Sequence, residues 1–280
     1  MAYLNGKPIF FSPHVHIKEP DIIVKSWADV QQIIREGKAK KVFSIGDQLK
    51  CVHGDAGILT WDIIGIDHDT PSDPNFTHSI TLQLHDSFPI GRIRTHFTDG
   101  DTWKDSMVRY WLNTPNSEYK RPADVGSSVY NHSFIYNLDE EFMNVVGTVE
   151  KKTRSRDSNT LDTTIDKFFL LSCFEVFGTS VPWTGYTNYG VGEGTVYEYY
   201  KQRSEHASPT NDADSGRIKY CYSIVDNKPY NYQVAHGWGL RSPYGPMADW
   251  SIMRDGKITT VNATAVNISA SYIMPACCIY

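Results

Sequence analysis

The chain has 280 residues, of which 40% are hydrophobic and 21% charged, and its formal net charge is −5. Its length allows one large domain or two small ones, and its composition is ordinary for a soluble globular protein. The negative net charge disfavours a nucleic-acid-binding surface, and no apolar run reaches the roughly 20 residues that a membrane-spanning helix needs. We therefore expect neither nucleic-acid binding nor membrane insertion.

The N-terminal region is predicted to be an extended arm followed by one short helix. Three prolines within the first twenty residues break any helix and favour an extended chain. Ser26 then offers a helix cap, and Gly37 a stop signal. The apolar residues between them recur at helical spacing: Trp27, Val30, Ile33 and Ile34. We assign residues 1–38 to this arm and helix, and residues 39–280 to the main domain.

The main domain is predicted to start with strands and continue with helices. Strand-like runs at 42–52, 58–67 and 79–84 are separated by turn signals, which indicates an antiparallel meander. Two amphipathic helices are predicted next, at 101–113 and 139–146.

The second half of the main domain has fewer periodic segments. A strand-like run at 167–171 leads into a capping box formed by Ser172 and Glu175, which predicts a short helix. Residues 179–245 are predicted to be long loops with one helix, at 196–202. Strands and helices that do not alternate strictly favour the α+β class.

Two clusters of basic residues occur, at 38–41 and 151–156. Runs of charged residues are usually solvated, because burying a charge is costly. We predict that both clusters are exposed loops.

The five cysteines are predicted to be buried, reduced side chains without a catalytic role. They show no C-x-x-C spacing, and their number is odd. Alternation along a strand would point the adjacent Cys277 and Cys278 to opposite faces. The set is Cys51, Cys173, Cys221, Cys277 and Cys278.

Metal binding has two weak candidates in the sequence. The first is Asp67-His68-Asp69 with His78, His85 and Asp86, but three consecutive residues of a strand cannot all face one ion. We expect no metal there. The second, Asn211, Asp212, Asp214 and Gly216, is similar to the front of a calcium loop, but position twelve is a serine in place of the usual Glu. Calcium held by loop carboxylates stays open, and no other cofactor is expected.

The C-terminal region is predicted to display a binding surface on a buried final strand. The chain closes on apolar residues, from Met274 to Tyr280. The segment 245–272 before it alternates small polar with larger residues around an Asp-Gly hairpin signal, a composition typical of a contact surface. The residues expected to recognise a ligand are Tyr244, Asp249, Trp250, Arg254 and Asn262. Trp238 and Arg241 have two possible roles, since the Arg241 guanidinium can contact a ligand or can satisfy carbonyl groups and stack on an aromatic ring inside the domain.

Several of these segments together resemble a known family. The segment Trp238 to Pro243, then Asp255-Gly256 and Pro275-Ala276-Cys277, resembles the end of a bacterial and phage domain family of the C-type-lectin fold. That family is similar to formylglycine-generating, sulfatase-modifying enzymes and to retroelement-diversified variable proteins. The likeness extends over roughly residues 40–280, through Phe43–Asp47, Trp61–Asp69, Val108–Asn113 and Asp166–Ser172. Residues Tyr3 to Ser12 resemble the start of phage tail and fibre proteins.

The resemblance implies a C-type-lectin-like α+β fold with antiparallel strands, a few short helices and long irregular loops. It also favours a structural role for Trp238 and Arg241 over contact with a ligand. It implies a phage virion protein, tail-associated, whose lectin-like domain recognises a host surface protein or glycan. The alternative is a head or tail decoration protein that cements its neighbours without touching the host. The N-terminal arm would bind other virion proteins, and the chain would form a homo-oligomer that is made in the bacterial cytoplasm and incorporated into the virion.

An enzyme related to the sulfatase modifiers is the third hypothesis. Those enzymes use a pair of cysteines separated by a few residues, whereas the only close pair here is adjacent and sits at the extreme end. The sequence also has no G-x-S-x-G nucleophile motif. We therefore expect that the protein is not an enzyme.

Overall fold

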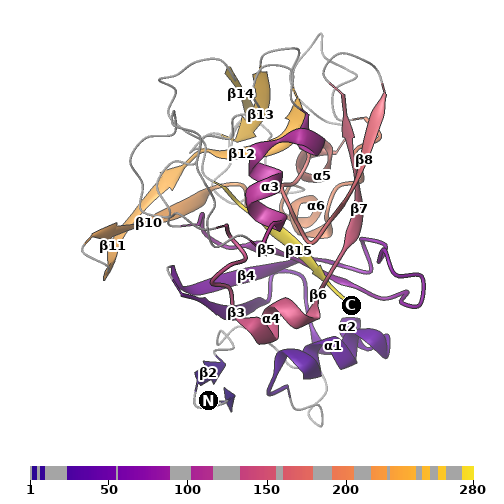
Figure 1. Ribbon diagram of the computed structural model, residues 1–280, viewed down its shortest axis with the longest axis vertical. Coiled ribbons are helices and arrows are strands. Elements are labelled where there is room, and N and C mark those ends of the chain that lie inside the picture. Colours follow the sequence, from indigo (N-terminus) through magenta and orange to yellow (C-terminus); the bar gives the residue numbers. More distant parts are fainter. Residues whose placement is uncertain are drawn as a thin grey trace.

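The computed structural model shows a mixed α/β protein built from antiparallel sheets and short helices (Figure 1). Helices α1, α2 and α4 lie at one end of the central sheet, and strands β13 and β14 lie at the opposite end of the molecule. The residues that the structure describes are 2–4, 7–9, 24–54, 56–88, 102–115, 133–155, 160–178, 191–204, 216–225, 228–243, 248–252, 258–262 and 273–280.

The central sheet joins the beginning of the main domain to the C-terminal end of the chain. Its strand order is β3-β4-β5-β15-β6, with β9 also paired to β15, and every pair is antiparallel. The predicted meander is thus present as its first three strands. The strands are β3 (Gln48–His53), β4 (Gly57–Ile66), β5 (Ile80–Leu84), β6 (Val146–Gly147), β9 (Phe168–Phe169) and β15 (Ala276–Ile279).

The prediction that the final strand is buried is confirmed. All four residues of β15 have 0% of their surface exposed. Cys278 pairs with Thr81 of β5 on one side and with Gly147 of β6 on the other. A strand that is hydrogen-bonded on both edges and apolar on both faces cannot detach without exposing the core, so this end of the chain is fixed in place.

Helix α1 (Trp27–Arg35) forms as its sequence predicts. The Ser26 hydroxyl accepts a hydrogen bond from the Asp29 backbone N–H at 3.0 Å, and Gly37 takes a positive φ of 68° just beyond the helix. The predicted apolar stripe is buried, and the Trp27 ring lies 4.6 Å from that of Phe142 on α4. Helix α1 therefore shares the core of the main domain, while the boundary at residue 38 stays a prediction.

The other helices lie near their predicted positions, with one exception. The sequence predicts a strand from residue 42, but residues 39–42 are helical and the strand starts at Gln48, because a turn at Ile45 and Gly46 comes first. The capping box of Ser172 and Glu175 is present. The helices are α2 (Ala39–Val42), η1 (Trp103–Asp105), α3 (Met107–Asn113), α4 (Glu140–Val145), α5 (Cys173–Phe177) and α6 (Glu198–Ser204).

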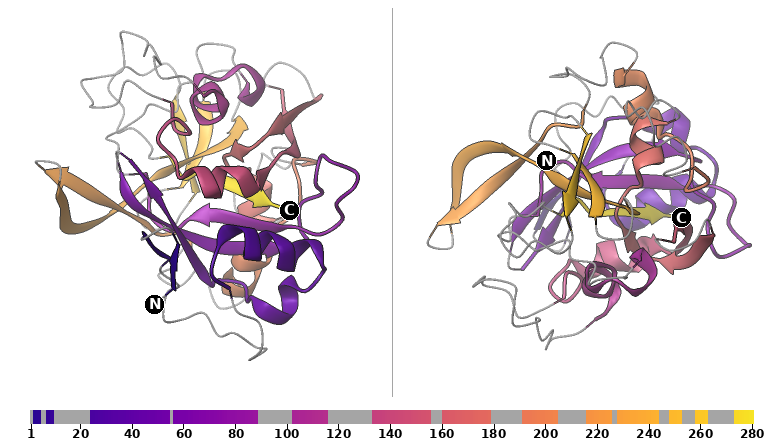
Figure 2. Two further views of the ribbon diagram at one scale, coloured as in Figure 1. Left: turned by 60° about the horizontal axis from the view of Figure 1, so that its bottom comes forward. Right: turned by 90° about the horizontal axis from the view of Figure 1, so that it is seen from above.

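The described residues also form four smaller antiparallel sheets around this core. The expectation of long loops over residues 179–245 was wrong in part, because a long hairpin and a buried strand occupy its second half. The hairpin β10–β11 reaches away from the rest of the chain in both views of Figure 2. The sheets are β1 (Ala2–Leu4) with β2 (Lys7–Ile9), β7 (Val149–Arg154) with β8 (Leu161–Asp166), β10 (Lys219–Val225) with β11 (Lys228–His236), and β12 (Trp238–Pro243) with β13 (Ala248–Ile252) and β14 (Ile258–Asn262).

Within the described residues, no helix is both long and apolar enough to span a bilayer.

Candidate functional site

The predicted recognition residues fall on the three-stranded sheet β12-β13-β14 and its connections. Asp249 and Trp250 lie in β13, and Asn262 ends β14. Position 248 pairs with 262 and position 250 with 260. Paired positions share a face of an antiparallel sheet and successive positions alternate, so positions 250 and 262 lie on one face and position 249 on the other. The remaining two predicted residues, Tyr244 and Arg254, lie outside the described residues.

Strand β12 holds this sheet to the body of the protein. All six of its residues are buried, and the Trp238 Nε1–H donates to the Arg217 carbonyl at 2.8 Å. The Arg241 guanidinium is fully buried and donates to the carbonyls of Leu170 and Glu193, each at 2.7 Å. The structural role predicted for Trp238 and Arg241 is confirmed by these contacts.

Arg241 also forms a bidentate ion pair with Glu175 of α5. Its two terminal nitrogens lie 2.5 Å and 2.9 Å from the two carboxylate oxygens. Burial alone would raise the pKa of Glu175, but the charges of Arg241 and then Lys151 outweigh burial and lower this pKa. Burial likewise disfavours the charged form of Arg241, and the charge of Glu175 more than offsets it, so the pKa of Arg241 is raised. Both groups therefore stay ionised inside the core.

A second buried cation, Lys151 of β7, extends this network. Its ammonium lies 2.5 Å from Asp69 Oδ1 and 3.2 Å from Glu175 Oε1, and it donates to the Tyr197 hydroxyl at 2.9 Å. The side chain of Lys151 is only 3% exposed. The prediction that residues 151–156 form an exposed loop was therefore wrong for the part that forms β7. The signal for a strand was present, since residues 149–154 alternate buried and exposed positions, but a lysine at an inward position hides that pattern.

A pocket of about 630 Å³ opens above this network. Its walls come from the β4–β5 connection (68–72), from residues 150–152 of β7, from Ile165 of β8 and from the segment 192–195, and Glu175 of α5 also lines it. The sequence analysis did not predict this pocket, because the segments that form it are far apart in the chain.

A second buried ionic cluster is centred on Asp62 of β4. Its other members come from β3, from α6, from β10 and from the residue that follows β5. Asp62 accepts hydrogen bonds from Gln48 and Tyr199, lies 2.9 Å from His85 Nδ1, and pairs with Lys219 at 3.4 Å. Burial acts to raise the pKa of Asp62, but the charge of Lys219 and the hydrogen bond to His85 lower it to about 2. Burial is also the larger influence on Lys219 and lowers its pKa. In the described part of the chain, no serine, threonine or cysteine side chain hydrogen-bonds His85.

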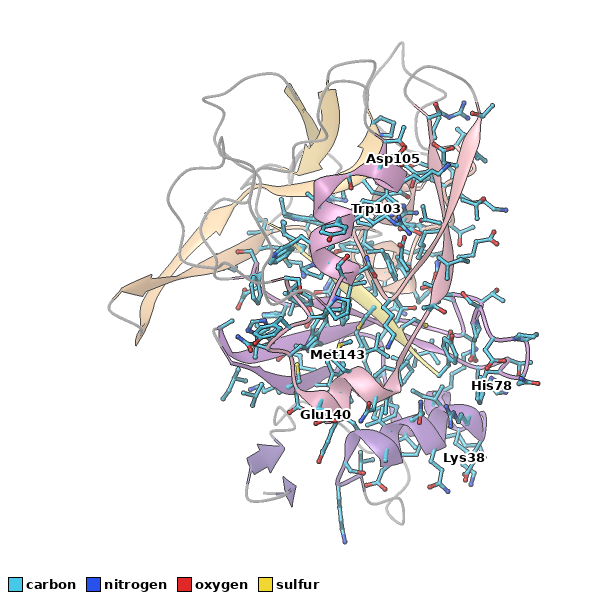
Figure 3. All side chains as sticks on the ribbon, viewed as in Figure 1. Lys38, His78, Trp103, Asp105, Glu140 and Met143 are labelled. Carbon is cyan, nitrogen blue, oxygen red and sulfur yellow. The ribbon has the colours of Figure 1, made fainter. Side chains whose placement is uncertain are left out.

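The first candidate cluster, where the sequence predicts no metal, has histidines and acids that contact other protein groups. Asp67 pairs with His78 and Lys40, each at 3.1 Å, and Asp69 pairs with Lys151. Figure 3 shows His78 at the outer edge of the molecule, near the segment that carries Lys38. Among the residues with described positions, no group of three or more His, Cys, Asp or Glu side chains could hold a metal ion. The calcium-loop residues Asn211, Asp212 and Asp214 lie outside the described residues.

Four of the five cysteines, Cys51, Cys173, Cys277 and Cys278, are buried free thiols, as predicted for small apolar side chains. Burial raises the pKa of each of these thiols above its usual value. A thiol with a raised pKa is a poor nucleophile because its thiolate form is rare at neutral pH.

Comparison of the chain with curated proteins gave no match, and comparison with solved structures gave none either. A family model does match residues 81–280, from β5 through the C-terminal strand. The matched part therefore includes β12, β13, β14 and most of the pocket. The chain belongs to the DUF6273 family, which is described as a domain of unknown function.

Proposed function

We propose that the chain is a phage virion protein, tail-associated, whose main domain has a C-type-lectin-like fold and displays β13, β14 and their connections to a host surface protein or glycan. Residues 1–38 attach it to other virion proteins, and the chain works as a homo-oligomer. Binding of this kind needs no cofactor and no catalytic step.

One observation carries the proposal: the segment 244–272 connects two buried elements, β12 and residues 273–280. Strand β12 ends at Pro243, and all of its residues are buried. Every residue from Ile273 to Tyr280 is buried as well. A segment held at both ends by a rigid core can change its sequence without unfolding the protein, which is what a recognition surface requires.

Both of these buried elements are hydrogen-bonded to the central sheet or to the segment that directly follows β9. Strand β15 pairs with β5, β6 and β9, while the Arg241 N–H of β12 donates to the Leu171 carbonyl that follows β9. The sheet that carries Asp249, Trp250 and Asn262 is thereby fixed relative to the core. Pre-organisation of this kind lowers the entropy lost on binding.

Binding to host cells tests the proposal. Fluorescently labelled protein is mixed with a panel of bacterial isolates and measured by flow cytometry. We expect binding to some isolates that falls at least tenfold in Trp250→Ala and in Asn262→Ala, which lie on one face of the sheet. Tyr136→Ala is the matched control, because this aromatic side chain is 46% exposed but belongs to a turn between α3 and α4. Equal binding by Trp250→Ala and the wild type would reject this face.

The position of the protein on the particle separates the two virion roles. Immuno-electron microscopy of the phage should label the distal end of the tail. Label on the head or along the tail tube, together with no binding to any isolate, would favour the decoration role. Light scattering of the purified protein measures its oligomeric state, and a monomer would contradict the proposed homo-oligomer.

A further inference from the structure

The pocket beside β7 is built as a rigid, polar site. Its floor is the network of Asp69, Lys151 and Glu175, and the Tyr197 hydroxyl bridges Lys151 and Asp69 with contacts of 2.9 Å and 2.8 Å. Thr81 also donates to Asp69, at 2.5 Å. These side chains are buried and hold one another in place, so the floor is fixed before any ligand arrives.

One wall of the pocket needs glycine to form. Gly192 and Gly194 adopt positive φ angles of 84° and 135°. A Cβ atom on Gly194 would lie 2.8 Å from Glu175 Oε1. The segment 192–195 can therefore approach the buried carboxylate only with glycine at this position, and this approach narrows the pocket over its floor.

The charges that line the pocket are already paired within the protein. Lys151 pairs with Asp69 and Glu175, and on the rim Lys152 lies 3.6 Å from Glu150. Glu175 is also paired with Arg241. The remaining acid of the lining, Glu193, is 1% exposed and accepts hydrogen bonds from the Ser242 hydroxyl and the Arg154 backbone N–H, and burial raises its pKa, which favours its neutral form. With Glu193 neutral, the other lining acids are matched by Lys151, Lys152 and Arg241, and no excess of either sign is left for an ionic ligand. A charged ligand would have to break one of these pairs, which disfavours it.

The lining nevertheless has unused hydrogen-bonding capacity. Carboxylate oxygens can each accept more than one hydrogen bond, and Asp69 Oδ1 accepts one, from Lys151. The Ser72 hydroxyl is shielded from solvent and has no hydrogen-bond partner among the described residues. Groups of this kind suit a ligand that carries several neutral donors and acceptors.

Apolar atoms form slightly more than half of the lining surface, and the lining includes one flat ring. Among the described lining residues, only Pro71 and Ile165 have apolar side chains apart from the glycines, so the remaining apolar surface comes from carbon atoms of polar residues, whereas pockets for hydrophobic ligands are lined mostly by apolar side chains. The His68 ring lines the pocket and is stacked on the buried Tyr197 ring, with centroids 4.0 Å apart. This stacking fixes the plane of the imidazole, against which the C–H groups of a hydroxylated ring can pack.

We propose that this pocket binds a neutral saccharide unit, at a site separate from the β13–β14 surface. The polar lining with balanced charges selects for hydroxyl groups, and the His68 ring supplies the flat contact. The volume lies within the roughly 300–1,000 Å³ of typical ligand pockets. The described residues that line it belong to other elements than β13 and β14, so the inference is argued independently of the proposed function.

A glycan array tests the inference on the full-length protein. The array carries neutral oligosaccharides of hexoses and N-acetylhexosamines, with sialylated and uronic-acid oligosaccharides as the anionic comparison. We expect binding to a subset of the neutral glycans, with the affinity for the strongest one then measured by calorimetry. No binding to any neutral glycan, or binding to anionic ones alone, would overturn the proposal.

Two matched pairs of variants locate the site. Thr195→Trp should block the pocket and weaken binding at least tenfold, while Thr163→Trp, at another exposed threonine on β8 that is not among the lining residues, should leave binding unchanged. Glu150→Gln should weaken binding about fivefold by removing one charge-assisted hydrogen bond. Its control is Glu36→Gln, since both glutamates are surface partners of a lysine two residues away.

The variants also separate this inference from the proposed function. Glycan binding that is lost in Thr195→Trp but kept in Trp250→Ala supports the pocket. Glycan binding that is lost in Trp250→Ala and kept in Thr195→Trp overturns the pocket and supports the β13–β14 surface. A Thr195→Trp variant that still binds bacterial cells shows that the two sites act independently.

Discussion

Removing the guanidinium of Arg241 should destabilise the protein more than any surface charge change. Arg241→Met keeps a long apolar stem but leaves Glu175 buried, at 2% side-chain exposure, without its bidentate partner. It also removes donors from the carbonyls of Leu170 and Glu193. Breaking one side of a buried ion pair costs about 3–5 kcal/mol, so we expect a loss of that size in the free energy of unfolding.

Urea denaturation followed by tryptophan fluorescence measures this loss as a shift of the midpoint at constant slope. The matched control is Lys38→Met, which removes the ion pair between Lys38 Nζ and Glu36 Oε2. These two atoms lie 2.7 Å apart, and the side chains of Lys38 and Glu36 are 48% and 40% exposed. The control should cost less than about 1 kcal/mol, because exposed pairs contribute little.

A double variant identifies the cause of the loss. In Arg241→Met with Glu175→Gln, no uncompensated charge is left in the core, so this protein should be more stable than Arg241→Met alone. If Arg241→Met costs as little as Lys38→Met, or if adding Glu175→Gln makes it worse, the account of a buried ion pair that anchors β12 is refuted.

Three further predictions concern the core, the pH dependence and the pocket wall. The pKa of Asp62 is about 2 in the folded protein against an ordinary 3.8, so its ion pair stabilises the fold above pH 4 and is lost as pH falls toward 2. The stability difference between wild type and Asp62→Asn, from urea midpoints, should therefore shrink by about 2 kcal/mol between pH 5 and pH 2, and a constant difference would contradict this. Ile279→Ala should cost about 2–5 kcal/mol, because it opens a cavity at a fully buried strand position, and a thermal midpoint within 2 °C of wild type would show that β15 can be loosened. Gly194→Ala should destabilise the fold more than Gly57→Ala. Both glycines have a positive φ, but of the two only Gly194 has an atom within 3 Å of the added Cβ. Equal melting temperatures of the two variants would reject the close approach of Gly194 to Glu175.

Local signals in the sequence determined several elements by themselves. The Ser26 cap and apolar spacing defined α1, and the Ser172 and Glu175 capping box defined α5, because both depend on contacts within one or two turns. The apolar C-terminus likewise predicted a buried strand, although not its partners. The hairpin β10–β11 could have been predicted too, since Asp226-Asn227 lies between two runs rich in tyrosine and β-branched residues.

Only the tertiary structure decided the role of the charged residues. Lys151 and Asp69 are 82 positions apart in the chain, and Arg241 and Glu175 are 66 apart, yet each pair is buried. A charged residue in a sequence is interpreted as solvent-exposed, because burying a charge is unfavourable unless a partner of opposite charge compensates for it. That partner is brought into place by strand pairing and helix packing, which no local pattern encodes. The pocket above these pairs is therefore a property of the assembled fold, whereas the helices around it are properties of their own segments.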